Sequence, residues 1–203
     1  VDFSSLSQTA SGTLILSNAT AFSAPKLAVT GNVTATAALT VEVKTTTATI
    51  LEHLLGLPVV TTLTVNALNT RNVFQSAIYP TLQTLNIGGA QGKAPFQSVV
   101  QSIVEINNTA ALKEVNITGG DFDTVSIDGT AALTSLSTAG EIKEFILNNS
   151  DLLAAATIGH AHLEGSDAAE ITVTNNAILA SLTTTALDEV GNITIETNAK
   201  LAA

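Results

Sequence analysis

The amino-acid sequence predicts an all-β protein in which short parallel strands stack into a β-solenoid of about 20–22 residues per coil. Three observations predict this fold. An apolar residue closes a recurring segment along the chain, apolar and polar residues alternate on either side of it, and asparagine or glycine recurs at one place before it. Such a period is typical of solenoids, in which each repeat stacks on the next. We therefore interpret residues 1–203 as a single solenoid domain.

Two strands are expected in each regular coil, one before the closing residue and one after it. The closing residues are Phe22, Leu39, Val60, Leu82, Leu112, Leu133, Leu153, Leu179 and Leu201. The first strand is predicted over 104–106, 125–127, 171–173 and 193–195, and the second over 63–65, 85–87, 115–117, 156–158 and 182–184. Residues two apart in a strand share a face, so the apolar pair of each triplet points inward and the polar residue outward.

The turn between the two strands has its own signature. Asparagine or glycine stands four residues before the closing residue at Asn18, Asn108, Gly129, Asn149 and Asn175. These two residue types best tolerate a left-handed backbone, and asparagine also bonds adjacent turns. We therefore expect a left-handed residue at this place in the regular coils.

Two segments depart from the pattern. The first third, residues 1–60, is irregular, and residues 49–57 are compatible with a short helix. The closing residues Leu82 and Leu112 are 30 residues apart, and glycines and a proline lie between them. This composition indicates an insertion loop over about residues 88–98 on one edge of the solenoid.

Composition excludes several classes of function. The formal net charge is −10 and the seven basic residues are scattered, so no basic stripe is available and we expect no nucleic-acid partner. The absence of cysteine excludes disulfides, thiolate metal ligands and a thiol nucleophile. No apolar run is long enough to span a bilayer as a helix, and no signal peptide is visible. The chain begins at Val1 and contains no methionine, so we expect a processed or excised segment of a secreted or cell-surface protein.

One segment carries a family resemblance. Residues 189–201, which read Glu-Val-Gly-Asn-Ile-Thr-Ile-Glu-Thr-Asn-Ala-Lys-Leu, resemble the receptor L-domain repeat, in which Gly-Asn or Gly-Asp precedes a strand that ends in Asn and then Leu. Similar repeats occur in fungal cell-wall proteins and in bacterial leucine-rich-like surface proteins. The resemblance covers about residues 99–201 and is weak before residue 60. It implies a right-handed β-solenoid that presents binding surfaces, with no catalytic residues to carry over. Receptor L domains usually have cysteine-stapled ends, which this chain lacks.

The outward positions of the second strands form the candidate binding surface, which we call the hydroxyl face. It comprises Thr62, Thr64, Thr84, Asn86, Asn116, Ser135, Ser137, Thr157, Ser181 and Thr183, and Glu114 and Ala155 interrupt it. A regular array of short hydroxyl groups resembles the Thr-x-Thr faces of solenoid ice-binding proteins. The alternative is that threonine is simply a favoured residue in exposed strands.

Two groups of residues are candidate metal ligands. Asp121, Asp123 and Asp128 could supply oxygen ligands to Ca²⁺, with solvated turn carboxylates as the alternative. His160 and His162 could bind zinc or iron, with surface histidines as the alternative. We expect no other cofactor.

The predicted outward positions do not contain the sets of residues that known catalytic mechanisms require. One row of the first strands reads Glu105, Ser126, Ile146, Thr172 and Thr194, which holds one carboxylate and therefore no acid/base pair. No nucleophile elbow, phosphate loop or dinucleotide fingerprint occurs. We therefore predict a non-enzymatic module for adhesion or for carbohydrate or protein binding. The alternatives are a structural subunit of a filament or surface layer, assembled by end-to-end stacking of coils, and ice binding.

Overall fold

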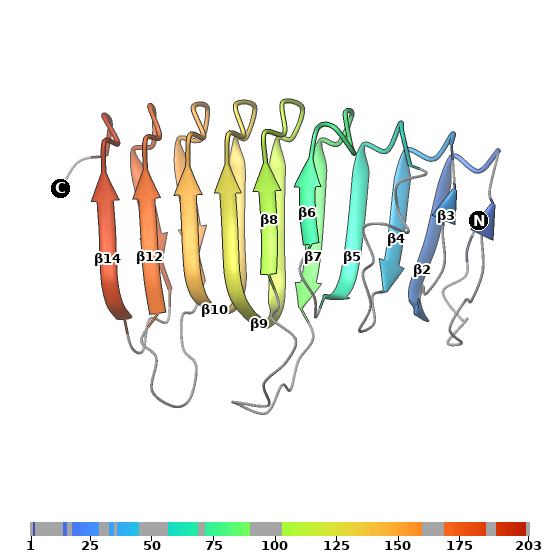
Figure 1. Ribbon diagram of the computed structural model, residues 1–203, viewed down its shortest axis with the longest axis horizontal. Helices are drawn as coiled ribbons and strands as arrows, with labels where there is room; N and C mark the ends of the chain where they lie inside the picture. Colours follow the sequence, from blue (N-terminus) through green and yellow to red (C-terminus); the bar gives the residue numbers. More distant parts are fainter. Residues whose placement is uncertain are drawn as a thin grey trace.

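The structure is a computed structural model that describes residues 2, 14–15, 18–28, 33–34, 36–44, 57–68, 72–89, 103–159, 169–185 and 190–201. Every regular element in these residues is a β-strand. The strands of the main sheet pair in parallel, and the chain winds into a right-handed β-solenoid, which confirms the predicted fold class (Figure 1). Of the stretch that was compatible with a helix, residues 49–56 lie outside the described residues.

The strands build two sheets. Those of the first half are β1 (Leu14–Ile15), β2 (Ala21–Ala28), β3 (Val33–Thr34), β4 (Thr40–Lys44), β5 (Thr62–Leu68), β6 (Asn72–Gln75) and β7 (Thr84–Gly89). Those of the second half are β8 (Ile103–Asn107), β9 (Glu114–Asp128), β10 (Ser135–Asn148), β11 (Ala155–Ile158), β12 (Ala169–Thr174), β13 (Ser181–Thr184) and β14 (Val190–Glu196). Strands β1 and β3 form a two-stranded sheet, and the other strands form a 12-stranded sheet.

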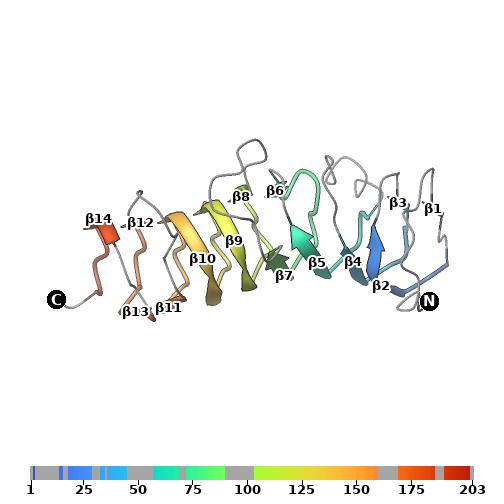
Figure 2. The ribbon, with the colours of Figure 1, turned by 90° about the horizontal axis from the view of Figure 1, so that it is seen from below.

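The 12-stranded sheet consists of two ladders on different sides of the solenoid (Figure 2). One ladder runs in the order β13-β11-β10-β9-β7-β5-β4-β2. The other joins β6, β8, β9, β10, β12 and β14. Strands β9 and β10 belong to both ladders, because each is long enough to continue around a corner of its coil.

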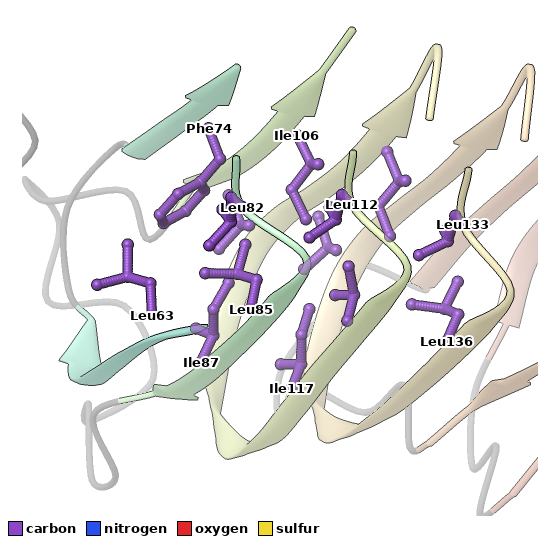
Figure 3. Packing of buried hydrophobic residues seen from close by; sticks show 14 of the residues in the cluster. Leu63, Phe74, Leu82, Leu85, Ile87, Ile106, Leu112, Ile117, Leu133 and Leu136 are labelled. Carbon is purple, nitrogen blue, oxygen red and sulfur yellow. The ribbon is translucent and has the colours of Figure 1, made fainter. Parts of the chain in front are cut away.

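The core is built of columns of apolar side chains that run along the solenoid. One column contains Leu63, Leu85, Val115, Leu136 and Ala156, and another contains Val104, Val125, Phe145 and Ile171. All of these residues are buried, and Figure 3 shows several of them packed between neighbouring coils. Each buried large aliphatic residue contributes about 1.5–3 kcal/mol relative to an exposed one. The inward orientation predicted from the alternation is confirmed.

The first two predicted closing residues are wrong. Leu39 is 48% exposed, whereas the neighbouring Ala38 is fully buried. The N–H of Thr61 donates to the carbonyl of Leu39, which places Leu39 one position after the closing residue, with its side chain outward. Phe22 is an inward strand residue that pairs with Val41. The described part of residues 1–60 therefore continues the regular ladder, since β2 pairs with β4 and β4 with β5.

The turns from Asn108 onward confirm the predicted left-handed position, whereas the other predicted residue, Asn18, stands four residues before Phe22, which does not close a turn. Positive φ angles occur four residues before the closing residue at Asn108 (50°), Gly129 (65°), Asn149 (52°), Asn175 (56°) and Thr197 (57°). In each of these turns the N–H of the closing residue donates to the carbonyl of the residue three positions before it, as from Leu112 to Thr109. The threonine at 197 was not anticipated, because a β-branched residue rarely adopts this backbone.

Glycines allow the coils to approach closely at the corner between the two ladders. Gly119 and Gly120 have φ angles of 68° and 94°. A Cβ on Gly140 would lie 2.8 Å from the Gly120 carbonyl oxygen, and a Cβ on Gly159 would collide with the backbone of Thr138. Gly88 and Gly89, at the start of the predicted loop over about residues 88–98, belong to β7, and residues 90–98 lie outside the described residues.

Candidate functional site

The ten predicted residues of the hydroxyl face lie in two straight rows on consecutive coils. The first row reads Thr40, Thr62, Thr84, Glu114, Ser135, Ala155 and Ser181, and the second reads Glu42, Thr64, Asn86, Asn116, Ser137, Thr157 and Thr183. Neighbours within a row are about 4.8 Å apart, and the two rows are about 7 Å apart, because of strand spacing and rise per residue. The structure therefore brings together all the residues predicted for this surface.

In the middle of the hydroxyl face, side chains on neighbouring coils are hydrogen-bonded to one another. The side-chain amide of Asn86 donates to Thr64 Oγ1 at 3.1 Å. The amide of Asn116 donates to Asn86 Oδ1 and to Glu114 Oε1, both at 3.0 Å. These groups already satisfy one another along three coils, so they have less capacity left for a ligand.

The C-terminal part of the hydroxyl face is different. We call it the C-terminal patch, and it comprises Ser135, Ser137, Ala155, Thr157, Ser181 and Thr183. Thr157 is half-buried, and the other five residues are exposed. The three strands that carry them pair without a register shift over these positions. The patch is therefore a regular surface of hydroxyl and methyl groups that contains no charged residue.

The opposite outward surface carries carboxylates, and here sequence reasoning missed a pair. The predicted row from Glu105 to Thr194 forms as expected and contains one carboxylate. Two residues earlier along the strands, however, Glu144 and Glu170 are direct partners on neighbouring coils. The start of β12 could not be placed from the sequence, so this pairing was not visible there.

The two glutamates do not form a common site. Glu144 Oε2 accepts a hydrogen bond from Thr124 at 3.0 Å, on the coil before it. Glu170 Oε1 accepts from Asn192 Nδ2 at 3.4 Å, on the coil after it. Each carboxylate therefore bonds away from the other, as mutual repulsion of like charges favours.

The structure does not bring Asp128 to the other two predicted calcium ligands, Asp121 and Asp123. Strand β9 is extended between Asp123 and Asp128, so these residues are about 16 Å apart along the strand. Asp128 Oδ1 accepts hydrogen bonds from the side-chain amides of Asn148 at 3.1 Å and Asn149 at 2.9 Å. In the part of the chain that the structure describes, no group of three or more histidine, aspartate or glutamate residues is arranged to hold a metal ion. His160 and His162 lie outside that part.

Sequence reasoning also missed a column of polar residues inside the turns, which we call the polar column. Its members stand three residues before the closing residue, at Tyr79, Thr109, Thr130, Ser150, Asn176 and Asn198. The first five are buried. The recurrence of Thr, Ser or Asn at this place, next to the Asn or Gly already noted, was the signal that could have identified the column.

Hydrogen bonds connect the second half of the polar column from coil to coil. The hydroxyl groups of Thr130 and Ser150 are 2.6 Å apart. The N–H of Ser150 donates to Asn176 Oδ1, and the N–H of Asn176 donates to Asn198 Oδ1, both at 3.0 Å. The column thus satisfies backbone donors that the turns would otherwise leave buried and unpaired.

Comparison of the chain with protein families, curated proteins and solved structures gives no match in any of the three. No helix capable of crossing a membrane occurs among the described residues. What the structure retains of the resemblance to L-domain and leucine-rich-like repeats is the parallel β-solenoid itself.

Proposed function

We propose that this chain is a non-enzymatic binding module of a secreted or cell-surface protein, in the manner of receptor L domains, and that it adheres to surface glycans through the C-terminal patch. The observation that carries the proposal is a run of uncharged hydroxyl groups on three consecutive coils, which are exposed on β10 and β13 and half-buried at Thr157 on β11. Hydroxyl groups both donate and accept hydrogen bonds, which is the chemistry of a neutral sugar surface.

The rigidity of the scaffold supports this proposal. Parallel pairing joins the three strands of the patch to one another and β10 to β9, and on the inner side Leu136, Ala156 and Leu182 occupy one apolar column. A ligand therefore meets side chains whose backbone is already ordered, and little entropy is lost on binding. A glycan fits better than a protein, because the patch lacks the aromatic and arginine residues that anchor most protein interfaces.

The substitution Thr183→Tyr tests the proposal, because a bulky ring on the patch prevents an extended ligand from lying flat. We expect this variant to fold normally and to bind glycans about tenfold more weakly, a loss of about 1.4 kcal/mol. The matched control is Thr172→Tyr, which makes the same change at an outward position of the other ladder. Binding is measured by cosedimentation with insoluble cellulose and chitin and on an array of immobilised glycans.

If Thr183→Tyr binds glycans as tightly as the control Thr172→Tyr does, the C-terminal patch is not the contact surface. Failure of the unmodified chain to bind any of these probes would remove glycan adhesion. Ice binding through the same rows stays a separate prediction, and faceted growth of ice crystals in a dilute solution of the chain would be its signature.

A specific observation favours self-assembly as the second candidate function. Ile193 and Ile195 in β14 are 54% and 44% exposed, whereas their partners Ile171 and Val173 in β12 are at most 2% exposed. In the described residues β14 pairs with β12 alone and β13 with β11 alone. Unpaired parallel edges beside exposed apolar residues are surfaces on which another coil can add.

Concentration-dependent size tests this second candidate. We expect the sedimentation coefficient of the chain to rise with concentration, and the double variant Ile193→Lys/Ile195→Lys to remove the rise by charging the edge. Leu152→Lys is the control, because Leu152 is exposed in a turn away from this edge. A sedimentation coefficient that is constant over a wide concentration range would exclude assembly of this chain.

A further inference from the structure

Two large apolar side chains lie exposed beside the C-terminal patch. Leu152 is 52% exposed and Ile178 is 38% exposed. Each stands directly before the closing residue of its turn, so the two occupy the same place on the coils of β11 and β13. Exposed alanines follow the closing residues, and the N–H of Ala180 donates to the carbonyl of Ala154 at 2.8 Å, which joins the two turns. We call these four residues, Leu152, Ala154, Ile178 and Ala180, the apolar strip.

The apolar strip begins only at the coil of β11. The same two places hold Ala111 and Lys113 on the coil of β9, and Ala132 and Thr134 on the coil of β10. From the strip the chain runs directly into β11 and β13, whose outward residues belong to the C-terminal patch. Exposed apolar groups and hydroxyl groups therefore lie side by side on the same coils.

The combined surface is regular and uncharged. Strands β11 and β13 pair without a register shift, and the three coils of the patch span about 10 Å along the solenoid axis. Charged residues border the surface at Asp151, directly before the strip, and at Glu114, the partner of Ser135 on the coil before it. Glu114 accepts hydrogen bonds from Thr84 and Asn116, which lie outside the patch. A ligand on this surface thus meets neutral hydroxyl and apolar groups.

A flat polysaccharide chain presents the same two kinds of group. In a β-1,4-linked chain successive sugars are turned over, so the chain is a ribbon with hydroxyl groups along its edges and C–H groups on its faces. Chains with α-1,4 or β-1,3 linkages curve into helices and offer no extended flat face. Contact between the C–H face and the protein removes apolar area from water, which favours binding.

We infer that this surface binds a flat β-1,4-linked chain, as in cellulose or chitin, which lies along the solenoid axis. Its C–H face covers the apolar strip, and the hydroxyl groups of its edge reach the hydroxyl rows alongside. The inference rests on the proposed function, since the strip by itself does not define a ligand. It adds the class of glycan and the role of Leu152 and Ile178, which supply contact area to the ribbon.

The double variant Leu152→Asn/Ile178→Asn tests the inference, because it makes the strip polar without adding a charge. Both side chains are exposed, so unfolding in urea should be unchanged. We expect binding to cellulose or chitin to weaken about tenfold or more, because the burial of apolar area is lost. The matched control is Leu39→Asn, since Leu39 is 48% exposed and lies far from the strip, directly before β4. Binding is measured by cosedimentation with insoluble cellulose, chitin, the β-1,3-glucan curdlan and granular starch.

The expected result is tighter binding to cellulose or chitin than to curdlan and starch, weakened by the double variant and not by the control. Binding to chitin alone would support the inference and add that the acetamido group takes part. Equal binding to curdlan or starch would overturn the inference and leave glycan adhesion standing. The same holds if Thr183→Tyr weakens binding and the double variant does not. Binding to none of the four polysaccharides would overturn the inference, whatever the array of glycans shows for the proposed function.

Discussion

Replacement of Leu179 by aspartate is expected to destabilise the protein by about 3–5 kcal/mol, because it puts an uncompensated charge into the apolar interior. Leu179 is fully buried and closes the turn between β12 and β13. Its neighbours along the solenoid axis are the closing residues Leu153 and Leu201, which offer no partner for a carboxylate. Protonation of the aspartate would remove the charge, but protonating a carboxylate at neutral pH itself costs free energy.

The effect should extend beyond one coil. Coils of a solenoid contact only their neighbours, so loss of one interface exposes the coils beyond it. We therefore expect urea unfolding, followed by far-ultraviolet circular dichroism, to begin at a lower concentration in Leu179→Asp. A separate early transition would come from the C-terminal coils.

The control for this prediction is the adjacent residue. Ile178 is 38% exposed, and its side chain lies on the outer side of the same turn. Ile178→Asp introduces the same charge one position away, and it should change stability by about 0.5 kcal/mol or less. If the two variants unfold alike, the inward and outward assignment of this turn is wrong.

The regular coils could be predicted from the sequence because their determinants are local. Alternation of polarity over three residues fixes which side chains of β8 and β12 point inward, and the structure agrees. The left-handed residue at Asn108 or Asn175 follows from a conformational preference of a single position. These signals do not depend on knowing which coil lies next to which.

The closing residues of the first coils could not be predicted correctly, because the size of an apolar residue does not indicate its burial there. Leu39 is the larger residue and is exposed, whereas the smaller Ala38 is buried. With Ala38 as the closing residue, the distance to Val60 becomes 22 residues, equal to that from Val60 to Leu82. Backbone hydrogen bonds between coils determine which of the two residues is buried. The sequence of a single turn does not reveal the register of these bonds.

In the candidate site, too, features fixed within one strand could be predicted, and features that depend on neighbouring coils could not. The two rows of the hydroxyl face follow from alternation within each strand, so they could be predicted. The division of that face could not, because the bonds from Asn116 to Asn86 and to Glu114 depend on side-chain geometry between coils. The pairing of Glu144 with Glu170 could not be predicted either, because it depends on the register between coils. That register shifts at the corner of the coil, as it does between Ala139 and Glu141 where β10 pairs with β9.

The second prediction with a large effect on stability concerns Asn176 in the polar column. Asn176 is fully buried, and its Oδ1 accepts the N–H of Ser150 at 3.0 Å. Its side-chain nitrogen lies 2.9 Å from the carbonyl oxygen of Thr174 and 3.0 Å from Asn198 Oδ1. Asn176→Ala removes these bonds and leaves a buried backbone donor without a partner, which alone costs about 1–3 kcal/mol. We expect a total loss of about 3 kcal/mol, measured by urea unfolding.

Amide hydrogen exchange can separate this mechanism from a general loss of packing. In Asn176→Ala the N–H of Ser150 should exchange faster by more than the global loss of stability explains, because its acceptor is gone. The neighbouring variant Asn175→Gly is the control. It removes an exposed amide from the same turn at a φ of 56°, a backbone that glycine adopts freely, so stability should change by about 0.5 kcal/mol or less. If the Ser150 amide stays as protected in Asn176→Ala as in the unmodified chain, the asparagine is a space-filling residue and the polar column does not hold the coils in register.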